Sequence, residues 1–177
     1  RASNKYKQVE FMSQFLGHTF EGVISGLSAN VNASYIHSEV TIVGDEYESR
    51  QNNLRQGENY SDKREMQGQA PYLVNFGLSY KNKANKIDIG LFYNVQGPTL
   101  SIVGINNRPN IYSAPFNSLN LNVLCDINKK SKLTFSIKNI LDEDRQMLTQ
   151  SYGSDQLIYS AYSPGKSFSF KWSYNIF

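Results

Sequence analysis

Long apolar runs are missing from this sequence of 177 residues. Hydrophobic residues make up 40% of it and the mean hydropathy is −0.48. No window approaches the roughly 18 to 20 consecutive apolar residues that a membrane-spanning helix requires, so spanning helices are excluded within these residues. Aromatic residues are plentiful by contrast: 12 Tyr and 10 Phe supply much of the apolar surface, a profile that suits a β-sheet better than a helical bundle.

Cysteine and excess charge are also scarce. Cys125 is the only cysteine, so it cannot form an internal disulfide, and cysteine usage does not report a redox compartment. The 18 basic and 15 acidic residues leave a net charge of +3 that is dispersed along the chain, which predicts no nucleic-acid partner. The chain opens without Met, at "RASNKYKQVEF", and we expect it to be the interior of a longer polypeptide.

What the sequence has instead is alternation. In its last stretch, "SFSFKWSYNIF" at 167–177, one parity holds Phe168, Phe170, Trp172, Tyr174 and Ile176, and the other parity holds Ser, Lys and Asn. A period of two residues is typical of an extended strand with two unlike faces. One face of this strand must be covered by a second layer of protein or by lipid.

The same alternation recurs upstream and predicts seven strands in all. Each is about 9 to 13 residues long, the length that a tilted strand needs to cross a bilayer. The six earlier segments lie at 7–16, 24–37, 71–81, 86–97, 118–128 and 131–140. We therefore predict an all-β fold, and within that class a segment of a transmembrane antiparallel β-barrel.

The predicted connections are alternately short and long. Tight polar turns lie at 82–86 and 128–131 and a short one at 17–22, whereas the connections at 44–70, 98–117 and 141–165 are long and polar. Outer-membrane barrels have brief periplasmic turns and extended outer loops, so we expect the long loops to face out of the cell. Seven strands alone would leave two unpaired edges in lipid, which predicts a larger barrel.

Five segments from residue 69 onward resemble the C-terminal barrel of TonB-dependent outer-membrane receptors, particularly the Bacteroidetes-type form. They are "QAPYLVNFGLSY" at 69–80, "FYNVQG" at 92–97, "RPNIYSAPFNSLNL" at 108–121, "IKNILDED" at 137–144 and "YSPGKSFSFKWSY" at 162–174. Together they cover most of the last 110 residues in order. "SANVNASYIHSEV" at 28–40 fits the pattern more loosely.

The resemblance implies a barrel of about 22 strands in a bacterial outer membrane, of which residues 1–177 would be the C-terminal portion. The earlier strands and the plug domain would lie outside this chain. Such receptors import a nutrient, for instance a metal chelate, a vitamin or a glycan, with energy from the TonB complex. The implied partners are outer-membrane lipid, the rest of the barrel and the plug, the TonB complex through the absent N-terminal part, and a possible surface lipoprotein. No cofactor is implied. The alternative is a structural or binding barrel of an outer-membrane assembly or secretion complex without import activity.

Three groups of residues are candidates for function. Aromatic, amide and guanidinium side chains in the outer loops could contact ligand or a surface partner, although the same groups populate an interfacial belt. They are Tyr47, Tyr60, Arg108, Asn110, Tyr112, Tyr152, Tyr159 and Tyr162. Polar residues on the inward parity, which would line a lumen or meet the plug, are Asn75, Asn94, Asn120, Asn122 and Lys138. The terminal strand would carry an assembly signal in Phe168, Phe170, Trp172, Tyr174 and Phe177, although Ile176 and not Phe177 is in phase.

Metal binding and catalysis are weaker readings. Asp45, Glu46 and Glu48 could ligate Ca²⁺, but a solvated loop is the simpler interpretation. His18 and His37 lie in unlike contexts, and neither has zinc-site spacing to Cys125. No motif selects a nucleophile with a base, or a pair of acids, so we expect no catalytic residues, no metal and no enzyme activity.

Overall fold

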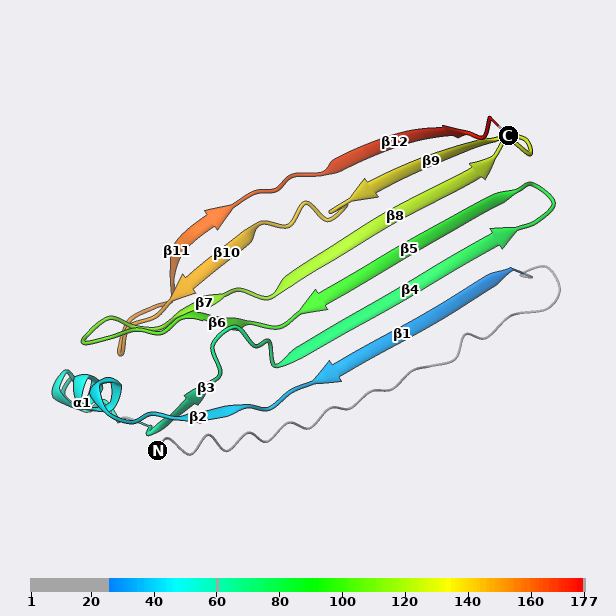
Figure 1. Cartoon of the computed structure of the whole chain (residues 1–177). Helices are drawn as coiled ribbons and strands as arrows, with labels where there is room; N and C mark the ends of the chain where they lie inside the picture. Colours follow the sequence, from blue (N-terminus) through cyan, green and yellow to red (C-terminus); the bar gives the residue numbers. More distant parts are fainter. Residues whose placement is uncertain (1–25, 60, 177) are drawn as a thin grey trace.

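The computed structural model describes residues 26–59 and 61–176. In these ranges the chain is almost entirely antiparallel β-sheet, with twelve strands and one short helix (Figure 1). No helix in the described ranges is long and apolar enough to span a membrane. The main sheet has six strands in the order β1-β4-β5-β8-β9-β12. Their bounds are β1 (Leu27–Tyr35), β4 (Tyr72–Asn82), β5 (Ile87–Gln96), β8 (Phe116–Asp126), β9 (Ser131–Lys138) and β12 (Ser167–Tyr174).

These six strands confirm the last six of the seven predicted from alternation, with ends that differ by a few residues. The predicted strand at 7–16 lies outside the described residues. Neighbours in the sheet are consecutive among these long strands, and every pair is antiparallel. The described strands form an open sheet, so the finer prediction of a barrel is not decided by their arrangement.

The strand register mainly pairs apolar residues with apolar residues and polar with polar across all six strands, so each face of the sheet is continuous. Because directly opposite residues point to the same side, the partner lists define rows across all six strands. One row on the apolar face is Leu27, Tyr80, Ile89, Val123, Phe135 and Phe170. The adjacent row on the polar face is Ser28, Ser79, Gly90, Asn122, Ser136 and Ser169. The predicted parity is thus the one that the sheet adopts.

No layer of described protein covers the apolar face. Phe135 is 38% exposed, and Phe170 and Trp172 on the last strand are 69% and 65% exposed. The buried hydrophobic residues of the described chain are Ile42, Ala70, Leu100 and Ile111, and none belongs to the six-stranded sheet. Among the described residues, therefore, no hydrophobic core lies against the large apolar surface of the sheet.

The long connections are more regular than the sequence suggested. A four-stranded sheet, in the order β11-β10-β7-β6, prolongs the main sheet at the loop end (Figure 1). It consists of β6 (Thr99–Ile102), β7 (Ile111–Ser113), β10 (Arg145–Thr149) and β11 (Leu157–Tyr162). A separate two-stranded sheet is formed by β2 (Glu39–Thr41) and β3 (Lys63–Glu65). Helix α1 (Asp45–Asn52) lies in the first long connection. Reading these segments as loops was wrong because Gly, Pro and Asn breaks divide strands of only three to six residues, too short for alternation to reveal.

Tight turns join the long strands at the opposite end. In the β4–β5 turn the Asn82 Oδ1 accepts the N–H of Asn85 at 3.0 Å, and in the β8–β9 turn the Asn128 Oδ1 accepts the N–H of Lys130 at 2.9 Å. Asparagine is favoured in turns because its side chain can replace a backbone acceptor in this way. Lys86 closes the first turn with a φ of 53°. The expected division into a loop end and a tight-turn end is therefore present.

Candidate functional site

The loop end contains a pocket of about 560 Å³, here called the loop-end pocket. Three segments far apart in the sequence line it: residues 50–58 from the end of α1 onward, 106–112 before and within β7, and 148–156 from the end of β10 onward. Arg, Asn, Gln and Tyr side chains dominate its wall. A second hollow of about 610 Å³ shares Arg50, Glu58, Asn110 and Tyr112 with it, so these residues belong to the walls of both.

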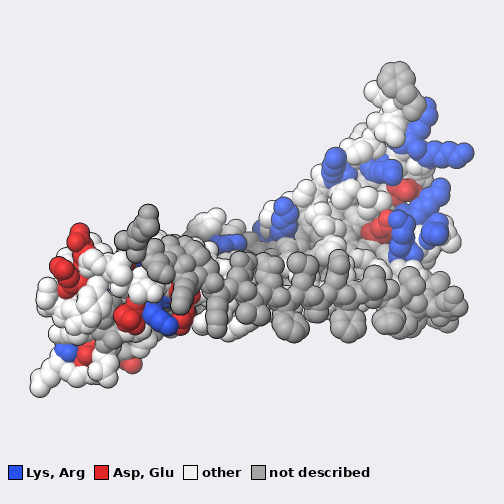
Figure 2. Space-filling view, turned by 60° about the horizontal axis from the view of Figure 1, so that its bottom comes forward, with Lys and Arg blue, Asp and Glu red and all other residues white. Residues whose placement is uncertain are grey.

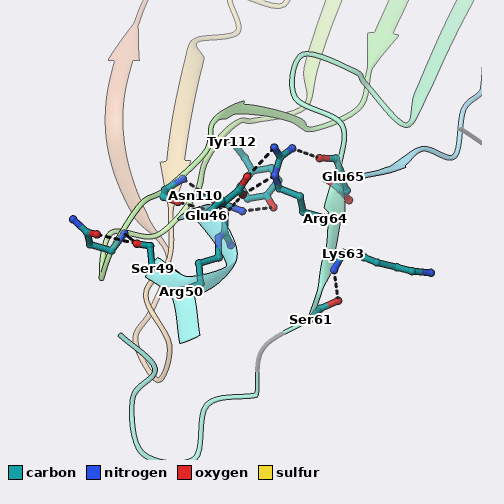
Figure 3. A network of polar contacts seen from close by, with 11 residues as sticks. Glu46, Ser49, Arg50, Ser61, Lys63, Arg64, Glu65, Asn110 and Tyr112 are labelled. Carbon is teal, nitrogen blue, oxygen red and sulfur yellow. Dashed lines mark hydrogen bonds and ion pairs between the residues drawn. The ribbon is translucent and has the colours of Figure 1, made fainter. Parts of the chain in front are cut away.

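An ion-pair network fixes α1 against the rest of the loop end (Figure 3). The Nε and Nη2 of Arg64 donate to the two carboxylate oxygens of Glu46 at 2.9 and 3.3 Å. The Nη2 of Arg50 donates to Glu46 Oε1 at 3.3 Å. These three side chains are only 18 to 25% exposed, so the network is better shielded from water than an ordinary surface pair. It positions a helix that buries no residue of its own.

Asn110 ties the β6–β7 connection to this network. Its Oδ1 accepts the N–H of Gly104 at 2.9 Å and an N–H of Arg50 at 3.1 Å. Its backbone carbonyl accepts the hydroxyl of Thr149 at 3.2 Å. One amide residue therefore links α1, the turn after β6 and the end of β10.

Tyr152 closes the other side of the pocket. Its hydroxyl donates to the carbonyl of Gly57 at 2.7 Å, and its own carbonyl accepts an N–H of Arg55 at 3.0 Å. These two bonds join segments about 95 residues apart in the chain. Hydrogen bonds between distant segments therefore fix the wall of the pocket on two sides.

The predicted ligand-contact residues divide into two groups. Arg108, Asn110, Tyr112 and Tyr152 line the loop-end pocket. Tyr47, Tyr159 and Tyr162 do not: Tyr47 lies on α1 with its hydroxyl accepting an N–H of Gln51, and the other two lie on β11, 58% and 64% exposed. Tyr60 lies outside the described residues.

Sequence reasoning missed Arg50, Arg55 and Thr149 in this pocket. Their roles depend on contacts between distant segments, which no local pattern encodes. A signal for α1 itself was present: Asp45, Glu46 and Glu48 fall in its first turn and Arg50 in its last, an arrangement that the helix dipole favours.

The predicted inward residues lie together on the polar face of the main sheet. Asn94, Asn120, Asn122 and Lys138 line a hollow of about 590 Å³, here called the sheet-face pocket, and Asn75 is the direct cross-strand partner of Asn94. Phe92, Phe116 and Arg145 also contribute, with the Arg145 guanidinium 3.9 Å from the Phe116 ring centroid. Of these side chains, Asn122 and Lys138 are exposed on this face and Asn94 is half-buried.

The acidic and imidazole groups do not converge. Glu46 is held between two arginines, which removes it from the proposed Ca²⁺ ligand set with Asp45 and Glu48. His37 lies 3.8 Å from Glu39, and His18 is outside the described residues. In the described ranges no three His, Cys, Asp or Glu side chains form a group that could hold a metal ion.

The terminal-strand aromatics lie on the apolar face. Phe168, Phe170, Trp172 and Tyr174 are 56 to 69% exposed on β12, and the rings of Trp172 and Tyr174 have centroids 6.4 Å apart. Phe177 lies outside the described residues. These side chains therefore form the most exposed part of the apolar face.

Comparisons with protein-family models, curated proteins and solved structures found no match to this chain. The chemistry of the two pockets is that of hydrogen bonding to a polar solute. Both combine guanidinium or ammonium donors with amide groups and aromatic rings, and the described residues that line them include no nucleophile paired with a base.

Proposed function

We propose that this chain is the C-terminal part of a TonB-dependent receptor barrel that imports a nutrient across a bacterial outer membrane. The single observation that carries the proposal is the broad apolar face with no layer of described protein over it. An apolar face of this size on one side of a sheet requires a cover, because leaving it in water costs about 25 cal/mol per Å². Hydrocarbon chains supply that cover without a second sheet.

Strand length supports a bilayer as the cover. Strand β4 has 11 residues, and at about 3.3 Å per residue it is roughly 36 Å long. Tilted by about 40°, it spans roughly 28 Å along the membrane normal, close to the height of the apolar band of outer-membrane barrels.

The open edge of the sheet supports a larger barrel. Among the described strands β12 pairs on one side only, with β9. Its other edge pairs with no described strand, and each backbone group left unpaired there would cost several kcal/mol in hydrocarbon. Further strands outside this chain would satisfy them by closing the barrel.

In this proposal the two pockets contact different partners. The loop-end pocket lies outside the cell and takes part in capturing the nutrient through Arg108, Asn110, Tyr112 and Tyr152. The sheet-face pocket faces the lumen and meets either the plug or the passing solute. The donor chemistry suits a metal chelate, a vitamin or a glycan.

Thiol accessibility tests the proposal that the apolar face meets lipid. Cys125 lies on the apolar face, in the row of Leu133 and Trp172. In outer-membrane vesicles of the full-length protein with Cys125→Ser, we expect Phe135→Cys to resist a water-soluble maleimide and Tyr159→Cys to react quickly. Both must react after denaturation. Rapid labelling of Phe135→Cys in the folded protein would exclude lipid as the cover.

A comparison of bacterial growth tests the proposal that the protein imports a nutrient. A strain lacking the gene is compared with its parent on media limited in turn for a chelated metal, a vitamin and a glycan. We expect one limitation to separate the two strains, and complementation to fail when TonB is absent. Equal growth on all three media, with outer-membrane assembly impaired, would favour a structural component without import.

A further inference from the structure

Positive charge is concentrated at the tight-turn end of the sheet. Residues 81–88, 126–132 and 171 hold seven Lys and two Asp, a net charge of +5. All other described charges lie at the loop end, where eight basic and eleven acidic residues leave −3. Figure 2 shows Lys and Arg gathered at one end of the molecule and Asp and Glu prominent at the other.

Five of these lysines form no ion pair with a described residue: Lys171 on the polar face of β12, and four more in the two turns. The two aspartates are engaged, Asp88 with Lys81 at 3.2 Å and Asp126 with Lys132 at 3.3 Å. Lys83, Lys86, Lys129 and Lys130 are exposed and form no ion pair with a described residue. We call these four residues the lysine rim.

The rim is one patch, although it comes from two turns. Strands β5 and β8 are neighbours, and the N–H of Asp126 donates to the carbonyl of Lys86 at 2.9 Å. On the far side the N–H of Asn175 donates to the carbonyl of Lys130 at 2.8 Å, which brings the end of β12 to the same place. The four ammonium groups therefore project from adjacent turns at a single edge.

The rim borders the apolar face directly. Trp172 lies on that face in the row of Leu133 and Cys125, and its Nε1 donates to the Oγ of Ser131, the residue that follows Lys130. Trp and Tyr rings favour the depth of the membrane interface. In a sheet inserted as proposed, the ammonium groups of the lysine rim would therefore lie just beyond the Trp172 ring, at the depth of lipid head groups.

We propose that the lysine rim binds anionic phospholipid head groups in the leaflet that borders the tight turns. This inference rests on the proposed membrane insertion and goes beyond it, since neutral lipids would cover the apolar face equally well. Flexible ammonium groups bind phosphate as point charges and need no rigid pocket. Opposite net charge at the two ends would also bias the orientation in which the sheet settles in an asymmetric membrane.

Native mass spectrometry of the full-length protein in non-ionic detergent tests the proposal. The probes are phosphatidylglycerol and phosphatidylcholine with the same acyl chains. The variants are Lys83→Gln with Lys86→Gln, Lys129→Gln with Lys130→Gln, and all four together. The matched control, Lys63→Gln with Lys166→Gln, removes the same charge at the loop end, where these lysines face Glu39 and Asp142.

We expect the parent protein to prefer phosphatidylglycerol and each rim pair to weaken that binding on the order of tenfold, since each lysine near an anionic surface contributes about fivefold at most before screening by salt. The control should stay within about twofold of the parent. Phosphatidylcholine binding should not change in any variant. Added salt should weaken phosphatidylglycerol binding to the parent more than to the variant with all four changes.

The proposal would be overturned by the absence of a lipid preference in the parent, or by the same preference in the variant with all four changes. Competition by millimolar inorganic phosphate as effective as that by the lipid would identify a general anion site instead, and would also overturn it. Flotation with vesicles distinguishes failure of the lysine-rim proposal from failure of the proposed membrane insertion. A protein that floats but shows no preference refutes the lysine rim alone, whereas one that does not float refutes membrane insertion as well. If the variant of one rim pair fails to fold, the variant of the other pair and the salt dependence of the parent protein still test the proposal.

Discussion

The indole Nε1 of Trp172 donates a hydrogen bond of 2.7 Å to the Oγ of Ser131. Ser131 is only 5% exposed, whereas Trp172 is 65% exposed. The bond therefore joins a buried hydroxyl at the start of β9 to a ring that lies open on β12. It ties the last described strand to its neighbour at the tight-turn end.

Loss of this bond should weaken the attachment of β12. We expect Ser131→Ala to lower the free energy of unfolding by about 0.5 to 1.5 kcal/mol, because it leaves the indole N–H without its acceptor. Urea unfolding followed by tryptophan fluorescence measures the change. Ser136→Ala, on the polar face of the same strand, is the control and should differ from the parent by less than about 0.5 kcal/mol. Equal effects of both changes would show that the bond contributes nothing to stability.

The two faces of β8 and β9 should tolerate arginine very differently. If the apolar face meets lipid, Leu121→Arg or Phe135→Arg should cost roughly 2 to 4 kcal/mol near the middle of the membrane. Asn122→Arg should be far milder. Asn122 is a better control than Asn120, whose Oδ1 accepts the backbone N–H of Asn139 at 3.1 Å. Reversible urea unfolding in lipid vesicles measures each cost, and similar costs on the two faces would contradict the assignment of a lipid-facing side.

Glu46 should hold the first long connection in place. Glu46→Gln keeps the size of the side chain but removes the charge shared by Arg50 and Arg64, and we expect a loss of about 1 to 3 kcal/mol in local stability. Hydrogen exchange of residues 44–66 should then speed up. Glu48→Gln, which removes an exposed carboxylate from the same helix turn, should leave the exchange unchanged. If both variants exchange alike, the network does not stabilise the loop end.

Gly104 should be required for the wall of the loop-end pocket. A Cβ at this position would collide with the backbone of Arg108 and Pro109, which cannot move as a flexible side chain would. Gly104→Ala should therefore open the turn, break the bond from Gly104 N–H to Asn110 Oδ1, and increase hydrogen exchange in 104–110. Ile105→Ala shortens an exposed side chain beside it and is the control. Unchanged exchange in Gly104→Ala would mean that the turn has room to adapt.

The main sheet was predictable because the information is local. Residues such as Val123 and Phe135 alternate with Asn122 and Ser136 along each strand, and side-chain direction in a strand has a period of two. Once the strands are known, short turns at 82–86 and 128–131 leave only antiparallel pairing of neighbours. The pockets were only partly predictable: Arg108 and Tyr112 were chosen for their residue type, whereas Tyr159, chosen on the same grounds, lies elsewhere.

Residue order alone determined the six long strands of the main sheet, their two faces and the division into tight turns and long connections, since each of these depends on neighbours within a few positions. Tertiary structure decided which long-connection residues meet. Arg50 reaches Asn110, and Tyr152 reaches Gly57, across 60 and 95 positions. Such contacts depend on how the backbone folds between the two residues. The sequence of each segment alone does not predict that path. The folded sheet also brought Lys83, Lys86, Lys129 and Lys130 to a single edge, because β5 and β8 lie side by side.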